Sequence, residues 1–166
     1  MHSSVRISAQ YATIISMIRR IAVRGIILHE GKLLCVRLKA YKGHLKRDNS
    51  YFCLPGGGLD EGEALVAGLQ REMLEETGVA AVVGNLLYVQ QFTYEDKEFL
   101  EFFFHVTNSQ DYLHIDLSKA SHGQAEIEEF GFVDPAQTYI LPEFLSSEPL
   151  EKHIASGRTK IISRLG

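Results

Sequence analysis

The sequence contains no tryptophan, only two cysteines and no long hydrophobic run. Two cysteines are too few for a disulfide scaffold, and because Cys35 and Cys53 both lie in apolar strand-like runs, we expect buried free thiols in a reducing cytoplasm. The longest apolar patch near the start, residues 12–18, is too short to span a bilayer, and its basic residues follow rather than precede it. We therefore expect neither a membrane span nor an export signal.

An excess of positive charge is also lacking. The formal net charge is −4, which does not favour binding to nucleic acid, although a small anionic ligand needs only a local basic site or a metal ion. Hydrophobic residues make up 45% and charged residues 23% of the chain, the composition of an ordinary globular protein. A length of 166 residues suits a single domain.

Proline is absent between Pro55 and Pro135, so a helix in this interval would not be interrupted. Pro55 is followed by three glycines, which indicate a loop whose backbone can approach a bound phosphate or ion closely. The apolar spacing after this loop predicts a helix over residues 63–77. Gly78 stands where a left-handed C-terminal cap is expected.

Three carboxylates share one face of this predicted helix, because Glu72, Glu75 and Glu76 stand at i, i+3 and i+4. They repel one another and oppose the helix dipole, unless a hard cation such as Mg²⁺ binds them. Carbonyls of the glycine loop could bind the same ion. Glu63 lies on roughly the same side as Arg71, so an ion pair between them could fix the loop against the helix.

These residues complete a known pattern. Gly57, Glu63 and the run Arg71–Val79 fit the Nudix box without a departure, so the chain resembles the Nudix hydrolase family. The resemblance implies an α+β fold, an α/β/α sandwich with a mixed β-sheet. It also implies a Nudix domain over residues 19–150, which leaves an N-terminal extension, 1–18, and a C-terminal tail, 151–166.

By the same resemblance, the chain would hydrolyse the diphosphate of a nucleoside diphosphate linked to another moiety, by attack of water at phosphorus with Mg²⁺ or Mn²⁺. Glu72, Glu75, Glu76 and the carbonyl of Gly56 would bind the metal. Gly57, Glu63 and Arg71 would support the site. Glu75 and Glu76 would act in catalysis with a downstream acid, for which we favour Glu129, while Glu126 and Glu128 remain alternatives.

The remaining segments predict strands around the box. Residues 20–29 and 32–39 indicate a hairpin, as do residues 80–94 and 97–106, with a turn possible at residues 84–85; residues 126–133 indicate a further strand. Asp134 and Pro135 predict a helix start, and Pro142 and Pro149 two short helices. The basic tail after Gly157 could fray, cover the sheet or contact a second subunit, which leaves a homodimer open.

Basic and aromatic residues before the box are candidates for substrate binding. Loop 40–50 is basic and could cover the phosphates, and an aromatic side chain after it could stack on a base. The candidates are Arg37, Lys39, Arg47 and Tyr51.

The identity of the nucleotide stays open. Tyr94 lies where Nudix members that hydrolyse ADP-ribose often carry proline, which leans away from that substrate and towards dinucleoside polyphosphates. Two other classes of function also stay open: a module that senses nucleotides without hydrolysis, and a domain that binds a partner on an inherited scaffold.

Overall fold

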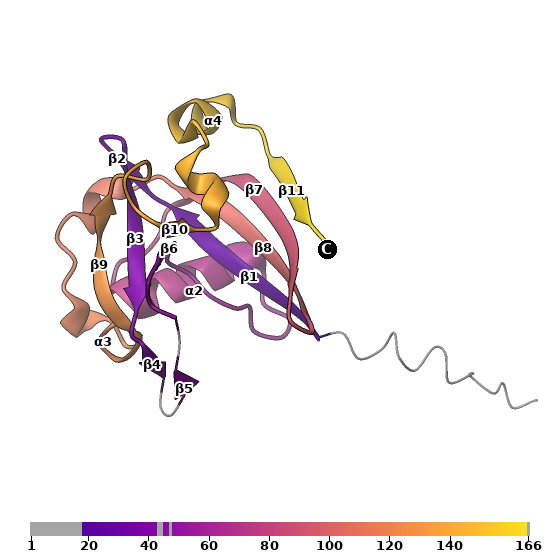
Figure 1. Ribbon diagram of the computed structural model, residues 1–166. Coiled ribbons are helices and arrows are strands. Elements are labelled where there is room, and N and C mark those ends of the chain that lie inside the picture. The colour runs from indigo at the N-terminus through magenta and orange to yellow at the C-terminus, as the bar shows by residue number, and fades with distance from the viewer. Residues whose placement is uncertain (1–17, 43–44, 47, 166) are drawn as a thin grey trace, which may run out of the picture.

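The computed structural model describes residues 18–42, 45–46 and 48–165, which form two mixed sheets (Figure 1). The first sheet has the order β1-β8-β7-β11. Its central hairpin joins β7 (Val83–Tyr94) to β8 (Lys97–Val106) through a turn in which Glu95 has a φ of 54°. This confirms the predicted hairpin. β1 (Ile18–Ile26) and β11 (Lys160–Arg164) add to it in parallel, one on each side.

The second sheet is built around β3 (Lys32–Leu38). β9 (Ile127–Val133) pairs antiparallel with β3 on one side, and β6 (Phe52–Cys53) pairs antiparallel with it on the other. β10 (Ile140–Leu141) is parallel to β6. β4 (Tyr41–Lys42) and β5 (Leu45–Lys46) form a separate small ribbon.

The first predicted hairpin is only partly right. β2 (Leu28–His29) pairs with β3, and the turn between them holds Glu30 and Gly31 at positive φ, as a tight hairpin requires. The longer strand before it, β1, instead pairs with β8 in the other sheet. The chain changes sheet at Ile27, which is fully buried. An Ile- and Val-rich run is compatible with either sheet, so the pattern alone could not place this break.

Helices cover both outer faces of the sheets, and each face has its own core. α2 (Leu65–Thr77) packs on one side through Leu69 and Met73. η4 (Glu143–Ser146) and α4 (Leu150–Ser156) lie on the other side, with Phe144 and Leu145 in the second core (Figure 1). Strand alternation sends neighbouring residues such as Leu33 and Leu34 to different cores. The expected α+β sandwich is therefore confirmed.

Other local predictions need correction. Residues 84–85 form no turn, because β7 continues through them with an irregular register. Asp134 begins only one turn of chain, in which its carboxylate accepts a hydrogen bond from the Ala136 amide at 2.9 Å. Residues 107–126 form an excursion of three short helices: η2 (Ser109–Tyr112), η3 (Leu117–Lys119) and α3 (Gly123–Glu126).

The cysteines are both free, and Cys35 is fully buried as expected. Cys53 is only partly buried and lines a cavity between the sheets, which the sequence did not predict. Within the part of the chain that the structure describes, no helix is long and apolar enough to cross a membrane.

Candidate active site

The glycine loop before α2 is attached to β1 by backbone hydrogen bonds. The amides of Val23 and Gly25 donate to the carbonyls of Gly57 and Pro55 at 2.9 and 3.0 Å. Gly56 has a φ of +123°, and a Cβ atom there would lie 2.3 Å from the carbonyl oxygen of Val23. Only glycine therefore allows the loop to lie this close to the strand.

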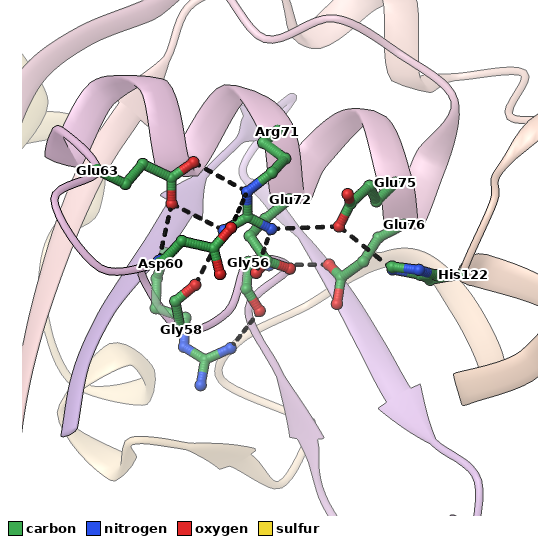
Figure 2. Close-up of polar contacts among 10 residues, drawn as sticks. Gly56, Gly58, Asp60, Glu63, Arg71, Glu72, Glu75, Glu76 and His122 are labelled. Atoms are coloured by element: carbon green, nitrogen blue, oxygen red, sulfur yellow. Dashed lines mark hydrogen bonds and ion pairs between the residues drawn. The ribbon is translucent and has the colours of Figure 1, made fainter.

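Arg71 connects the start of the box helix to its acidic face. Its guanidinium donates to both oxygens of Glu63 at 2.9 Å and to the carbonyl of Gly58 at 3.0 Å. It also contacts Glu72 at 2.9 Å and Glu75 at 3.2 Å, as Figure 2 shows. Thus the predicted pair of Glu63 and Arg71 is confirmed, and the same arginine orients two of the three carboxylates.

Glu63 is held in its ionised form by this contact. The hydrogen bonds from Arg71, followed by the one from the Asp60 amide, lower the pKa of Glu63 to about 2. The carboxylate thereby remains charged at all physiological pH values. It can act as a fixed anchor for the guanidinium.

His122 reaches the acidic face from the excursion between β8 and β9. Its Nδ1 lies 3.2 Å from Glu75, and its backbone amide donates to the Glu75 carbonyl at 2.9 Å (Figure 2). The sequence alone assigned no role to His122 at this site. Its contact with the helix depends on the path of a long excursion, which no local spacing reveals.

Glu76 differs from Glu72 and Glu75, because its hydrogen bond comes from the glycine loop rather than from Arg71. Its Oε2 accepts a hydrogen bond from the Gly56 amide at 2.8 Å. Burial raises the pKa of Glu76 to about 7, and the Gly56 amide and Arg24 oppose this effect. A carboxylate that is this costly to ionise would be stabilised by a bound cation.

Arg24, on β1, binds the carbonyl of the same residue, Gly56. Its Nη1 donates to the Gly56 carbonyl at 2.6 Å, and its Nε and Nη2 both contact Glu101 at 3.2 Å. Gly56 is therefore bound through its amide to one functional side chain and through its carbonyl to another. The carbonyl of Gly56, which was predicted as a metal ligand, accepts this hydrogen bond from Arg24.

A cavity of about 740 Å³ lies beside this loop, between the two sheets. Its floor is formed by the face of the first sheet that carries Arg24, Gln90 and Glu101, and Tyr51 and Cys53 contribute from the opposite sheet. Arg24 belongs both to the lining and to the glycine loop contact, so the cavity reaches the acidic helix. A ligand in the cavity can therefore place one end beside Gly56.

The predicted substrate-binding residues are divided. Tyr51 lines the cavity, but Arg37 and Lys39 are not among the described residues that do so. Arg37 instead stacks over the ring of Phe52, 4.3 Å from its centroid, and pairs with Glu129 at 3.2 Å. Arg47 lies outside the described residues.

The downstream acids also occupy different environments. Glu129 is exposed and lies opposite Arg37 in the register of β3 and β9. Glu128 accepts a hydrogen bond from Asn49 at 2.8 Å. Glu126 is close enough to Glu76 for its charge to raise the pKa of that carboxyl.

The donor set fits a divalent cation, although among the described residues no three acidic, His or Cys side chains already converge on one point. Glu72, Glu75 and Glu76 offer oxygen ligands on one helix face beside a carbonyl. A Cβ atom at Gly57 would lie 2.6 Å from the Glu72 carboxylate, so glycine is needed to leave that carboxylate its place. The chemistry of hard oxygen donors matches Mg²⁺ or Mn²⁺.

Sequence reasoning missed the polar residues of the cavity floor. Arg24, Gln90 and Glu101 lie within strands that are otherwise strongly apolar, and all three face the cavity. Polar side chains on the inner face of a strand can indicate a binding site, because burying a polar group without a hydrogen-bond partner costs free energy.

Comparison with known proteins agrees with this geometry. The family model described as NUDIX domain matches residues 18–153. No curated protein matches the sequence significantly. Among solved structures, a UDP-X diphosphatase is similar with a TM-score of 0.64 and 21% identity over 96% of this chain and 76% of that one.

Two further solved structures show the same fold. A MutT protein from Methanosarcina mazei Go1 has a TM-score of 0.62 and 23% identity, over 86% of this chain and 98% of that one. A NUDIX hydrolase from Nitrosomonas europaea has a TM-score of 0.61 and 20% identity, over 85% and 92%. At these identities the likeness concerns the fold.

Proposed function

Since this chain belongs to the Nudix family and is a pyrophosphohydrolase, we propose that it uses a divalent cation to cleave the diphosphate of a nucleoside diphosphate linked to another moiety. The observation that carries the proposal is the junction at Gly56. There the carboxylate of Glu76 accepts a hydrogen bond from the backbone amide of Gly56, and the lining residue Arg24 donates one to the carbonyl of the same residue. Metal ligands and substrate cavity thus meet at a single point.

The residues that would hold Mg²⁺ or Mn²⁺ are Glu72, Glu75, Glu76 and the Gly56 carbonyl. When bound, such an ion neutralises phosphate charge and makes hydroxide available near neutral pH. Arg71 fixes the orientation of Glu72 and Glu75. Glu76 is kept in place by the Gly56 amide. These contacts align the ligands before substrate arrives, which lowers the cost of reorganisation during the reaction.

A general base must take a proton from the attacking water. Glu75 and Glu76 are candidates on the helix, and Glu129 is the downstream candidate from the sequence. Arg37 is paired with the Glu129 carboxylate, so it would compete with the attacking water for this acceptor. The influence of Glu126 on Glu76 supports Glu126 as the alternative. Comparing Glu126→Gln with Glu129→Gln decides between them, because the base should lower kcat far more than KM.

The experiment that tests the function is hydrolysis of a nucleotide panel with and without Mg²⁺ or Mn²⁺. The panel contains nucleoside triphosphates, oxidised guanine nucleotides, ADP-ribose, sugar nucleotides including UDP-sugars, and dinucleoside polyphosphates. We expect metal-dependent cleavage of one class, and its loss in Glu76→Gln. A folded protein that cleaves no member of the panel, with or without metal, would contradict the proposal.

A further inference from the structure

Gln90 is a buried polar residue whose side-chain oxygen has no partner in the described part of the chain. It lies in β7 and is only 3% exposed, yet it lines the cavity between the sheets. Its Oε1 is buried and has no hydrogen-bond partner among the residues that the structure describes. The facing residue in β8, Glu101, accepts two hydrogen bonds from Arg24 through its Oε1 atom.

Such an acceptor is unfavourable for folding alone. A buried group without a partner costs free energy that an apolar side chain of similar size would not cost. Strand propensity also favours a branched or aromatic residue at this position over glutamine. Because Gln90 lines a cavity, an acceptor kept at this cost indicates that a ligand supplies the missing donor.

The surroundings of Gln90 suit a flat aromatic ligand. Two positions along the same face, Phe92 stacks on Phe99 with ring centroids 4.9 Å apart and planes inclined by 8°. Both rings line the cavity, and Tyr51 faces them from the other sheet. Aromatic rings stack favourably on any nucleobase. A side-chain amide can then distinguish one base from another by hydrogen bonds to the base edge.

The position of Gln90 also matches the reach of a nucleoside. In the register of the first sheet, Ala22 of β1 faces Glu101 of β8, which faces Gln90 of β7. Two strand spacings, about 10 Å, therefore separate Gln90 from the strand that carries Arg24 and the glycine loop. A substrate whose diphosphate lies at the glycine loop can therefore place its base against the cavity-facing side of the first sheet.

We propose that Gln90 is a specificity-determining residue that hydrogen-bonds the nucleobase of the substrate, with the Phe92–Phe99 pair as its apolar platform. This rests on the proposed function and deepens it, because it assigns the cavity to a nucleobase rather than to a sugar, lipid or polyol end of a diphosphate. A carboxamide places an acceptor beside a donor. This arrangement complements base edges on which an N–H group adjoins an acceptor.

The test uses nucleoside monophosphates, which contain no anhydride bond and so cannot be consumed by a pyrophosphohydrolase. Binding of AMP, GMP, CMP, UMP and ribose 5-phosphate is measured by calorimetry in Mg²⁺ for wild type, Gln90→Leu and Gln91→Leu. Gln91 is the matched control, because its side chain lies on the opposite face of β7, where it donates to Glu98. The melting temperature of each variant verifies that it is folded.

We expect wild type to bind at least one nucleotide about tenfold or more tightly than ribose 5-phosphate. Gln90→Leu should lose about tenfold in affinity for that nucleotide and bind ribose 5-phosphate as before, whereas Gln91→Leu should behave as wild type. Equal affinity of wild type for all five ligands, or an unchanged preference in Gln90→Leu, would overturn the proposal. Hydrolysis of the panel is scored separately, so a metal-dependent enzyme without base preference would refute the role of Gln90 alone.

Discussion

Replacing Glu76 with glutamine should stabilise the metal-free protein while it removes activity. The substitution keeps an oxygen that can accept the hydrogen bond from the Gly56 amide, and it removes only the charge. In the folded protein the pKa of Glu76 is about 7, against an ordinary value of 4.5, because burial disfavours the charged form. Ionised Glu76 is therefore a net cost to folding in the absence of a cation.

The size and the pH dependence of this effect follow from the two pKa values. A carboxyl whose pKa is higher in the folded state binds more protons when folded, so its presence lowers stability as pH rises from 4.5 to 7. Above pH 7 the full cost is about 3 kcal/mol, and at pH 5 it falls to about 1 kcal/mol. For a chain of this length, 3 kcal/mol corresponds to about 6–12 °C in melting temperature.

The assay is thermal unfolding in EDTA between pH 5 and pH 8.5, followed by the same series in Mg²⁺. We expect Glu76→Gln to melt well above wild type at pH 8 in EDTA, with the difference shrinking at pH 5. Mg²⁺ should raise the melting temperature of wild type more than that of Glu76→Gln, because the ion binds the native carboxylate. Equal melting temperatures at pH 8 in EDTA would refute the argument that burial of this carboxylate is costly.

Three further predictions concern single contacts. In chemical denaturation, Gly56→Ala should destabilise the protein by more than about 2 kcal/mol, because the added Cβ would lie 2.3 Å from a carbonyl oxygen in a backbone conformation that favours glycine. The control Gly131→Ala should cost far less, because its Cβ would meet no atom within 4 Å. Gln90→Leu should raise the melting temperature by about 2–4 °C, because it removes an unpaired acceptor. Gln91→Leu should lower the melting temperature, because it removes a hydrogen bond to Glu98. A lower melting temperature for Gln90→Leu would contradict the reasoning. Glu63→Gln should be less stable than wild type above pH 4.5, and the gap should close as pH falls from 4.5 to about 2 in acid denaturation, since the folded pKa is depressed to about 2.

The parts of the site that the sequence could predict are those fixed by helix geometry. Arg71 and Glu75 are one turn apart within α2, so the 3.6-residue repeat places their side chains together whatever the rest of the fold does. Glu63 lies just before α2 begins, so its contact with Arg71 depends also on the loop that leads into the helix. The glycine cap was predictable for the same reason, because Gly78 ends α2 with a φ of 72°. Local spacing is sufficient where the interacting residues belong to one element.

The cavity was not predictable, because its residues meet only through strand order. Periodicity indicates that residues 20–29 are extended, but it does not say that β1 lies beside β8 rather than β3. Until that neighbour is known, nothing brings Glu101 to Arg24, which is 77 residues away in sequence. Of the predicted substrate-binding residues that the structure describes, Tyr51 lines the cavity and Arg37 and Lys39 do not, so their part in binding stays a prediction.

Arg24 explains how two separately encoded parts of the site can work together. Its guanidinium binds Glu101 on the cavity floor and the carbonyl of Gly56 in the loop. The backbone amide of the same residue, Gly56, donates to Glu76. A shift of Gly56 towards a cation would therefore alter its contact with Arg24, and a ligand that drew Arg24 towards the cavity would alter the position of Gly56. In the proposed function the metal ion and the substrate both act on Gly56, so any effect of one on the affinity for the other is reciprocal and equal in size.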